Sequence, residues 1–548
     1  MTDDGTRRGA ALMASGTAVS RGLGLLRGMV MVSAIGATGQ AADAFAVANK
    51  LPNVLYMLLA GGVLNAILVP QVVRAYKRKV GQEYVDRLLT FGFAALAAVT
   101  VVLTLAAPLL VNLYSDFDNP AQQALATAFA YWCIPQLFFY GVYGLLGQVL
   151  NARGSFGPYM WAPAVNNLVA IVGFGVFIAV FGVWSRSDVV EASTWTAGQT
   201  ALLAAAATLG VVAQAVVLIP PLRRAGVRYR PRWGLRGSGL GTAGGVATWT
   251  LTGLAIGQLG YVVVSNVASA APAAAVAEGA APSAVAGTAA YDVAFLIFML
   301  PHSLVTVSLA TALFTRLSGQ AHDADVAGVR TTLSSGLRVV GVFTVFATAA
   351  IAVLALPLTR VVLATASAGS AEAVATVVLT MILGLPAFGA WSMYQRAYYA
   401  YEDARSMVPI QIVMAGIVAL GAVLAQAFLR PSLWVAGVGA AMSLSYVAGA
   451  LIAQWRLRLR LGGVDDARVV RLMVRATLAG LVSAAVGLGV LQLLRLGLST
   501  SFAASLIQCA VVGTVMVLVY GGALRLLRVR ELDELLVPVV RRLRRGRR

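Results

Sequence analysis

Charged residues are scarce in this sequence, and acidic ones are the scarcer kind. Aspartate, glutamate, lysine and arginine make up 11% of the 548 residues, 59% are hydrophobic, and the mean hydropathy is +0.83. A soluble domain is about 25% charged, so a soluble protein of this length is excluded. Apolar runs long enough to cross a bilayer about 30 Å thick recur along the chain. They lack the period-two alternation of an outer-membrane barrel, which predicts an all-α polytopic membrane protein.

Cysteine and histidine are nearly absent. Two cysteines, Cys133 and Cys509, and two histidines, His302 and His322, are too few to favour a disulfide framework or a metal site. There is no Walker loop, and no nucleophile, histidine and acid occur in a catalytic pattern. These absences argue against an enzyme, and we expect neither catalytic residues nor a bound cofactor or metal.

The net charge of +20 comes from basic residues in the short connections between apolar runs. Lysine and arginine concentrate in the cytoplasmic loops of membrane proteins, so we expect no nucleic-acid partner. The N-terminus carries Arg7 and Arg8 before an apolar run, as a signal peptide does. Two further arginines interrupt that run and no small-residue cleavage site follows, so we interpret it as a retained first span.

Hydropathy predicts fourteen membrane spans. They cover residues 10–35, 45–73, 88–113, 123–150, 159–183, 195–219, 239–266, 290–315, 334–358, 374–398, 407–429, 433–454, 474–494 and 501–524. Basic residues gather in the connections at 74–87, 223–236 and 456–475, which all fall on one side. The opposite connections hold few arginines and include an Ala/Pro-rich stretch, 268–287. The positive-inside rule then places both termini in the cytoplasm.

An internal repeat relates the two halves of the chain. "LPNVLYMLLAGG" at Leu51 corresponds to "LPHSLVTVSLAT" at Leu300, and "FYGVYGLLGQ" near Gly141 to "AFGAWSMYQR" near Gly389. An offset of six spans preserves orientation, so we predict parallel repeats about an axis along the membrane normal. The predicted parts are an N-terminal six-helix lobe (1–222), a basic cytoplasmic linker (223–238), a C-terminal six-helix lobe (239–460), two further helices (461–524) and a basic cytoplasmic tail (525–548). The tail either lies on the inner leaflet and binds anionic lipid, or its arginines serve only to keep this end of the chain in the cytoplasm.

Two arginines lie inside the first predicted span, in "SRGLGLLRG" from Ser20 to Gly28. Arg21 and Arg27 are about 240° apart around a helix. Charges at this depth usually face a cavity or a partner, and the guanidinium fork suits phosphate. The alternative is structural: Arg27 pairs with a carboxylate such as Asp43, or Arg21 extends to the inner surface.

Other polar residues lie in the second and eighth spans. Asn49 and Asn53 share one helix face next to Lys50 and Pro52. They either line a polar cleft or join helices at a kink. His302 in span eight is either a packed histidine or a proton relay.

These motifs together resemble the opening of the MurJ/MviN lipid II flippases, in the multidrug/oligosaccharidyl-lipid/polysaccharide exporter superfamily. "SRGLGLLRG", "DAFAVANKLPNVL" and "NAILVPQVVRAY" are the most specific matches, and "QRAYYAYEDARSMVP" is looser. The sequence is identified as a divergent, actinobacterial-like member. The resemblance implies two six-helix lobes around a central cavity, and a groove for a lipid tail on the last two helices. The implied activity is movement of lipid-linked peptidoglycan precursor, lipid II, from the inner to the outer leaflet of the bacterial plasma membrane.

The resemblance also implies the residues of the site. Arg21 and Arg27 match cavity arginines implicated in binding the anionic headgroup. The matching polar positions are Ser20, Asp43 and Asn53.

Four positions depart from the family pattern. Tyr56 and Leu296 stand where members carry basic residues, and Gly28 and Gly61 where they carry acidic ones. Lys50 or Arg396 would supply the missing positive charge.

Alternative functions share this fold or membrane setting. As a flippase, the protein would carry lipid II or a related lipid-linked glycan. A drug/cation antiporter of the same fold would need an intramembrane carboxylate to bind its coupling ion. A scaffold for cell-wall synthesis or division proteins has no reason to keep arginines in a cavity. A membrane-embedded transferase needs an acid or metal cluster. Transport would be coupled to the membrane potential or to a monovalent cation.

Overall fold

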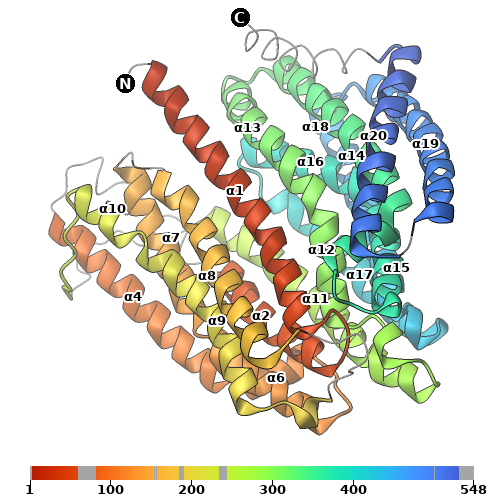
Figure 1. Ribbon diagram of the computed structural model, residues 1–548. Coiled ribbons are helices and arrows are strands. Elements are labelled where there is room, and N and C mark those ends of the chain that lie inside the picture. The colour runs from red at the N-terminus through yellow and green to blue at the C-terminus, as the bar shows by residue number, and fades with distance from the viewer. Residues whose placement is uncertain are drawn as a thin grey trace, which may run out of the picture. The chain divides into compact units, whose positions relative to one another are not determined.

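The computed structural model describes residues 3–59, 82–153, 155, 157–183, 191–233, 244–498 and 500–529, and these residues form helices and no strand (Figure 1). In chain order the first helices are α1 (Asp3–Ile35), α2 (Gln40–Leu59), α4 (Gln82–Leu105), α5 (Ala107–Tyr114), α6 (Pro120–Cys133), α7 (Gln136–Ala152), α8 (Gly157–Phe181), α9 (Ala197–Val216), α10 (Ile219–Arg224) and α11 (Gly244–Ala277). They are followed by α12 (Thr288–Pro301), α13 (Val307–His322), α14 (Val326–Val362), α15 (Ala368–Ile382), α16 (Leu385–Ala400), α17 (Val408–Phe428), α18 (Trp434–Leu461), α19 (Asp466–Gly497) and α20 (Phe502–Leu526).

The predicted spans recur as helices of membrane-crossing length. Among the residues described, twelve helical segments are long and apolar enough to cross a membrane, and the bent pair α15–α16 makes a thirteenth. The remaining predicted span, 45–73, begins in α2 and continues beyond the described residues. The all-α polytopic prediction is therefore confirmed, whereas the count of fourteen stays a prediction.

Sequence signals mark many helix ends. Asn119 caps α6 ahead of Pro120, and Thr196 forms a capping box with Gln199 at the start of α9. At its C-terminus, α18 stops at Gly462, whose φ of +66° is easy only for glycine.

The fourth and tenth predicted spans are each built from two helices. The break between α6 and α7 contains Pro135, and α15 and α16 meet at a 49° bend just before Pro386. Proline lacks the N–H for the helical ladder, so a span broken there is expected. These two spans correspond to each other in the sequence repeat, so the interruption that they share supports the repeat.

Contacts group the chain into two compact units. The first contains Met1–Val293 with Thr365–Ser370 and Arg430–Ser432, and the second contains the remainder. The first unit thus includes α11, which the repeat assigns to the second lobe. The repeat-based boundaries at 222, 238 and 460 stay predictions, because units defined by contacts do not follow repeats.

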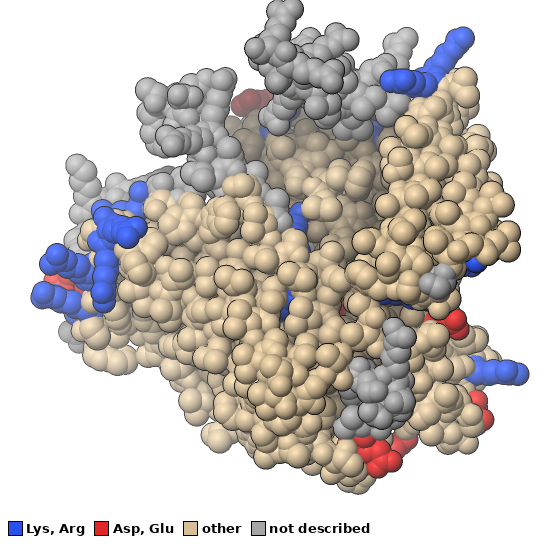
Figure 2. All heavy atoms as spheres, in the orientation of Figure 1, with Lys and Arg blue, Asp and Glu red and all other residues tan. Residues whose placement is uncertain are grey.

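On the face drawn in Figure 2, most charged side chains lie near the edges, and the surface between them is mostly of other residues. In the first unit, Glu83 binds both Arg87 and Arg232 at 2.7 and 2.8 Å, so two predicted inside connections meet at one end. In the second unit, Arg460 lies 2.6 Å from Asp403, which likewise joins two predicted inside connections.

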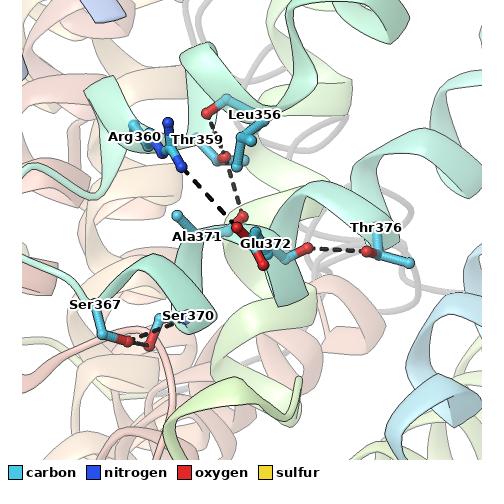
Figure 3. A network of polar contacts seen from close by, with 8 residues as sticks. All are labelled: Leu356, Thr359, Arg360, Ser367, Ser370, Ala371, Glu372 and Thr376. Carbon is cyan, nitrogen blue, oxygen red and sulfur yellow. Dashed lines mark hydrogen bonds and ion pairs between the residues drawn. The ribbon is translucent and has the colours of Figure 1, made fainter. Parts of the chain in front are cut away.

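The connection between α14 and α15 carries one of the few arginines predicted outside. Arg360 lies 4.0 Å from Glu372, and the Thr359 hydroxyl donates to the Ala371 carbonyl (Figure 3). The charge of Arg360 is therefore balanced within its own connection.

The Ala/Pro-rich stretch 268–287 is helical in its first half. The seventh predicted span ends at residue 266, and α11 continues through Pro272 to Ala277, whereas the outside location of the stretch stays a prediction. Alanine is the strongest helix former, and this outweighs one proline.

Candidate substrate-binding site

Arg27 lies in the interior of the first unit. Its half-buried side chain projects from α1, and its electrostatic neighbours are Tyr140 and Cys133, on either side of the α6–α7 break. Among the described residues, no carboxylate pairs with its guanidinium. The structural alternative, an ion pair between Arg27 and Asp43, is not formed. A guanidinium at this depth without a protein anion is available to an anionic ligand.

Arg21 lies about two turns before Arg27 on α1. The adjacent Ser20 carbonyl accepts a hydrogen bond of 2.8 Å from Asn167 Nδ2, which fixes this part of α1 against α8. Arg21 is itself half-buried, and no acidic partner is found in the part of the chain described. The backbone of Ser20 thus helps to hold the part of α1 that carries the two arginines.

Asp43 acts on a helix terminus. Its side chain is 1% exposed, and Oδ1 accepts a 2.7 Å hydrogen bond from the backbone N–H of Ala289, in the first turn of α12. A carboxylate at this place satisfies an otherwise unpaired N–H and complements the helix dipole. A Cβ at Gly287 would collide with this carboxylate, so glycine is required there. Asp43 therefore positions α12 against α2.

Lys50 is already paired. Its ammonium lies 2.8 Å from Asp292 Oδ1 on α12 and 5.6 Å from the centroid of the Tyr261 ring on α11. Both side chains of the ion pair are 27% exposed. The idea that Lys50 supplies the positive charge missing from the family pattern is weakened, because Asp292 balances that charge within the unit.

Sequence reasoning missed Asp292 as a site residue. It lies near one end of the eighth predicted span. The available signals were that a carboxylate in an apolar span needs a partner, and that Asp292 corresponds to Asp43 at the offset that relates Leu51 to Leu300.

Tyrosines occupy the place where the family pattern predicts a basic residue. The rings of Tyr56 and Tyr140 have centroids 5.6 Å apart, and Tyr143 stacks on Tyr159 at 4.8 Å. Arg27 therefore has Tyr140 as a neighbour, and Tyr140 in turn contacts Tyr56. Of the two asparagines on α2, Asn53 is exposed and Asn49 is half-buried.

The candidates in the second unit are engaged in aromatic packing. His302 is 4% exposed, and its ring lies 4.2 Å from that of Phe388, which favours the packed histidine over a proton relay. Arg396 lies 5.5 Å from the Phe314 ring on α13. Leu296 is half-buried on α12.

A groove of about 380 Å³ lies in the second unit. Its walls come from α14, α16, α18 and α19, and most of its lining is apolar, including Val470, Met473 and Val474 of α19. Several neighbouring apolar side chains of α19 are more than half exposed, among them Leu478 at 51%. This face of α19 can accept an apolar chain.

Comparison with known proteins identifies the family. The model of the family described as "Lipid II flippase MurJ" matches residues 31–508. The chain is 27% identical over 449 residues to a probable lipid II flippase MurJ of Rhizobium meliloti, covering 79% of this chain and 76% of the relative. It is 26% identical over 485 residues to the probable lipid II flippase MurJ of Vibrio cholerae, covering 85% of both.

Solved structures share the fold. A lipid II flippase MurJ in an inward closed conformation aligns with a TM-score of 0.67 and 17% identity, over 94% of this chain and 99% of that one. A multidrug resistance MATE family transporter in an inward-facing conformation aligns at 0.61 and 14%, over 81% and 96%. At such identities the likeness concerns the fold alone. The match of the family model over most of the sequence shows that this chain, a multi-pass protein of the bacterial inner membrane, belongs to the MurJ lipid II flippase family.

Proposed function

We propose that this protein moves lipid II from the inner to the outer leaflet by alternating access. The observation that carries the proposal is Arg27, a half-buried guanidinium inside the first unit with no acidic partner among the described residues. Family membership supplies the cargo class, since the relatives are named lipid II flippases. A pyrophosphate offers the negative charge and the oxygen geometry that arginine binds bidentately.

In this proposal Arg21 and Arg27 hold the pyrophosphate of the undecaprenyl-linked precursor. Each hydrogen bond to a charged group contributes about 1.5–3 kcal/mol. Tyr140 is a neighbour of Arg27 and contacts Tyr56, and Asn53 is exposed on α2. Aromatic and amide groups are therefore available to the sugar-peptide part of the headgroup.

Switching between states requires contacts that differ between them. The Lys50–Asp292 ion pair joins α2 to α12 and is formed in this conformation. We propose that it stabilises the present state and separates when α12 moves. The membrane potential contributes about 2.3 kcal/mol per elementary charge moved across 100 mV, which biases such a transition. A monovalent cation is the other source of coupling energy.

The lipid tail is proposed to occupy the groove against α19. Its apolar lining and the exposed apolar side chains around it support this role. The tail then stays in an apolar medium while the headgroup crosses the membrane.

A drug/cation antiporter of the same fold is less well supported. The half-buried carboxylate of Asp292 is the group that would bind a coupling cation, but it lies 2.8 Å from the Lys50 ammonium. A cation would have to displace that ammonium first.

The proposed orientation places both termini and the arginine-rich connections in the cytoplasm. In a variant lacking Cys133 and Cys509, we expect Ser193→Cys to react with an impermeant maleimide in intact spheroplasts, because η2 (Ala192–Thr194) would face outward. Arg224→Cys, in α10, should react only after the membrane is opened. The reverse labelling pattern would invert the topology.

Transport is tested with the purified full-length protein in liposomes containing fluorescent lipid II. We expect lipid II initially confined to the inner leaflet to become accessible to an added glycosyltransferase, whereas a fluorescent phosphatidylcholine stays in place. Equal accessibility in protein-free liposomes, or movement of both lipids, would contradict a lipid II flippase.

A further inference from the structure

A second cavity lies in the first unit, at the end where Arg87 and Arg232 meet Glu83. Its volume is about 740 Å³, within the range of roughly 300–1,000 Å³ typical of small-molecule sites. The walls come from α4, α7, α9 and α10, and the rim comes from residues 227–229. None of the candidate cargo-binding residues Arg21, Arg27 and Lys50 lines it.

The inside of this cavity is apolar and aromatic. Phe93 of α4, Phe138 and Val142 of α7, and Val216 of α9 contribute to its walls. Val216 is 49% exposed and Ile219 38% exposed, so large apolar side chains lie open at the edge of the cavity. In a membrane-spanning protein such an edge faces acyl chains, and an apolar chain entering here would cover these side chains.

The mouth of the cavity is basic. Arg223 and Arg228 line it, and neither has a carboxylate partner in the described part of the chain. The nearby carboxylate is already engaged, because Glu83 binds Arg87 and Arg232. The hydrogen bond from Arg232, together with the charges of both arginines, lowers the pKa of the Glu83 carboxyl, which stays ionised and bound. Arg223 and Arg228 thus remain for an external anion.

The rim is held in place by contacts with α4. The hydroxyls of Tyr229 and Thr90 are 2.9 Å apart, and the Arg232 backbone N–H donates to the same threonine at 3.0 Å. The Tyr229 ring packs edge-on against Phe93 with centroids 5.5 Å apart. These contacts fix the backbone next to Arg228. Basic side chains gather over α10 and the beginning of α4 in Figure 2.

We infer that this cavity binds an anionic glycerophospholipid of the adjacent leaflet, with an acyl chain among Phe93, Phe138 and Val216 and the phosphodiester between Arg223 and Arg228. Apolar walls alone would accept any lipid, so the unpaired arginines select the negative headgroup. Basic pockets between membrane helices on the cytoplasmic side are suited to such headgroups. In the orientation proposed above, the lipid comes from the inner leaflet. The site is separate from the cargo site and does not depend on the identity of the cargo.

The test is native mass spectrometry of the full-length protein purified in detergent. The probes are phosphatidylglycerol and phosphatidylcholine with identical acyl chains. Two arginine contacts of about 1 kcal/mol each correspond to a roughly 25-fold weaker affinity for phosphatidylglycerol in the Arg223→Gln/Arg228→Gln variant. The matched control is Arg224→Gln/Arg230→Gln, which removes the same charge from exposed neighbours that do not line the cavity. An equal loss of affinity for phosphatidylglycerol in both double variants would mean that the lipid is attracted by the overall positive charge of this surface, and it would overturn the proposed site.

A second pair of variants tests the apolar part. Val216→Trp fills the cavity and should weaken binding of phosphatidylglycerol, whereas Val217→Trp, beside it but outside the lining, should not. Phosphatidylglycerol with a photoreactive acyl chain should label α4, α7 or α9 in the unmodified protein, and labelling confined to other helices would contradict the inference. The Arg27→Gln variant should still bind phosphatidylglycerol, and the Arg223→Gln/Arg228→Gln variant should still bind lipid II. Failure of the phospholipid site is therefore distinguishable from failure of the proposed lipid II transport.

Discussion

Replacing Arg27 with glutamine is expected to weaken lipid II binding about 10- to 100-fold, because at least one charge-assisted hydrogen bond is lost at a desolvated site. Glutamine keeps much of the side-chain length and one amide donor but loses the charge. Native mass spectrometry of the purified protein with lipid II measures the change directly, and transport in liposomes should fall with it.

Two controls separate this effect from a general loss of charge. Arg27→Lys keeps the charge without the fork and should bind with intermediate affinity. Arg360→Gln removes an arginine whose charge is balanced by Glu372, and it should leave lipid II binding unchanged. If Arg27→Gln and Arg360→Gln bind lipid II alike, the arginine of α1 does not hold the cargo.

The second large effect concerns the Lys50–Asp292 pair. Replacing either residue with alanine leaves an unbalanced charge in an apolar setting, which we expect to cost about 2 kcal/mol for this partly exposed pair. The free energy of unfolding in mixed micelles, measured for both single variants and the double alanine variant, gives the coupling energy.

The charge-swapped protein provides the decisive comparison. Lys50→Asp combined with Asp292→Lys should be more stable than either single swap, because the opposite charges meet again. The contact at 4.0 Å between Arg360 and the exposed Glu372 serves as a control, and Glu372→Ala should cost less than about 1 kcal/mol. Additive effects of the two swaps would show that Lys50 and Asp292 do not act as a pair.

The helices were largely predictable from local sequence, and so was the position of Arg27 inside one of them. Long apolar runs locate spans because length and hydropathy are local properties, and Arg27 was recognised because a charge in such a run needs a partner or a cavity. The helix α11 extends to Ala277, beyond the end of the seventh predicted span, because the alanines keep the helix intact where alanine and proline together suggested a connection.

The contacts between distant residues were not predictable. Asp43 binds a backbone N–H at Ala289, a donor that every residue except proline carries, so no side-chain pattern points to it. Lys50 and Asp292 were both visible in the sequence, but their pairing depends on how α2 and α12 pack. Tyr140 was likewise an ordinary span residue until the packing of α7 placed it near Arg27, with Tyr56 of α2 against its ring.

The π-helical segment His302–Thr306 sets the rotational phase of the helix that follows it. A π turn holds one residue more than an α turn, so a single deletion within it would restore a continuous α-helix from α12 into α13. Every later side chain of α13 would then turn by about 100°, and Phe314 would leave the guanidinium of Arg396. The length of this five-residue segment, more than its composition, therefore decides which face α13 presents to α16.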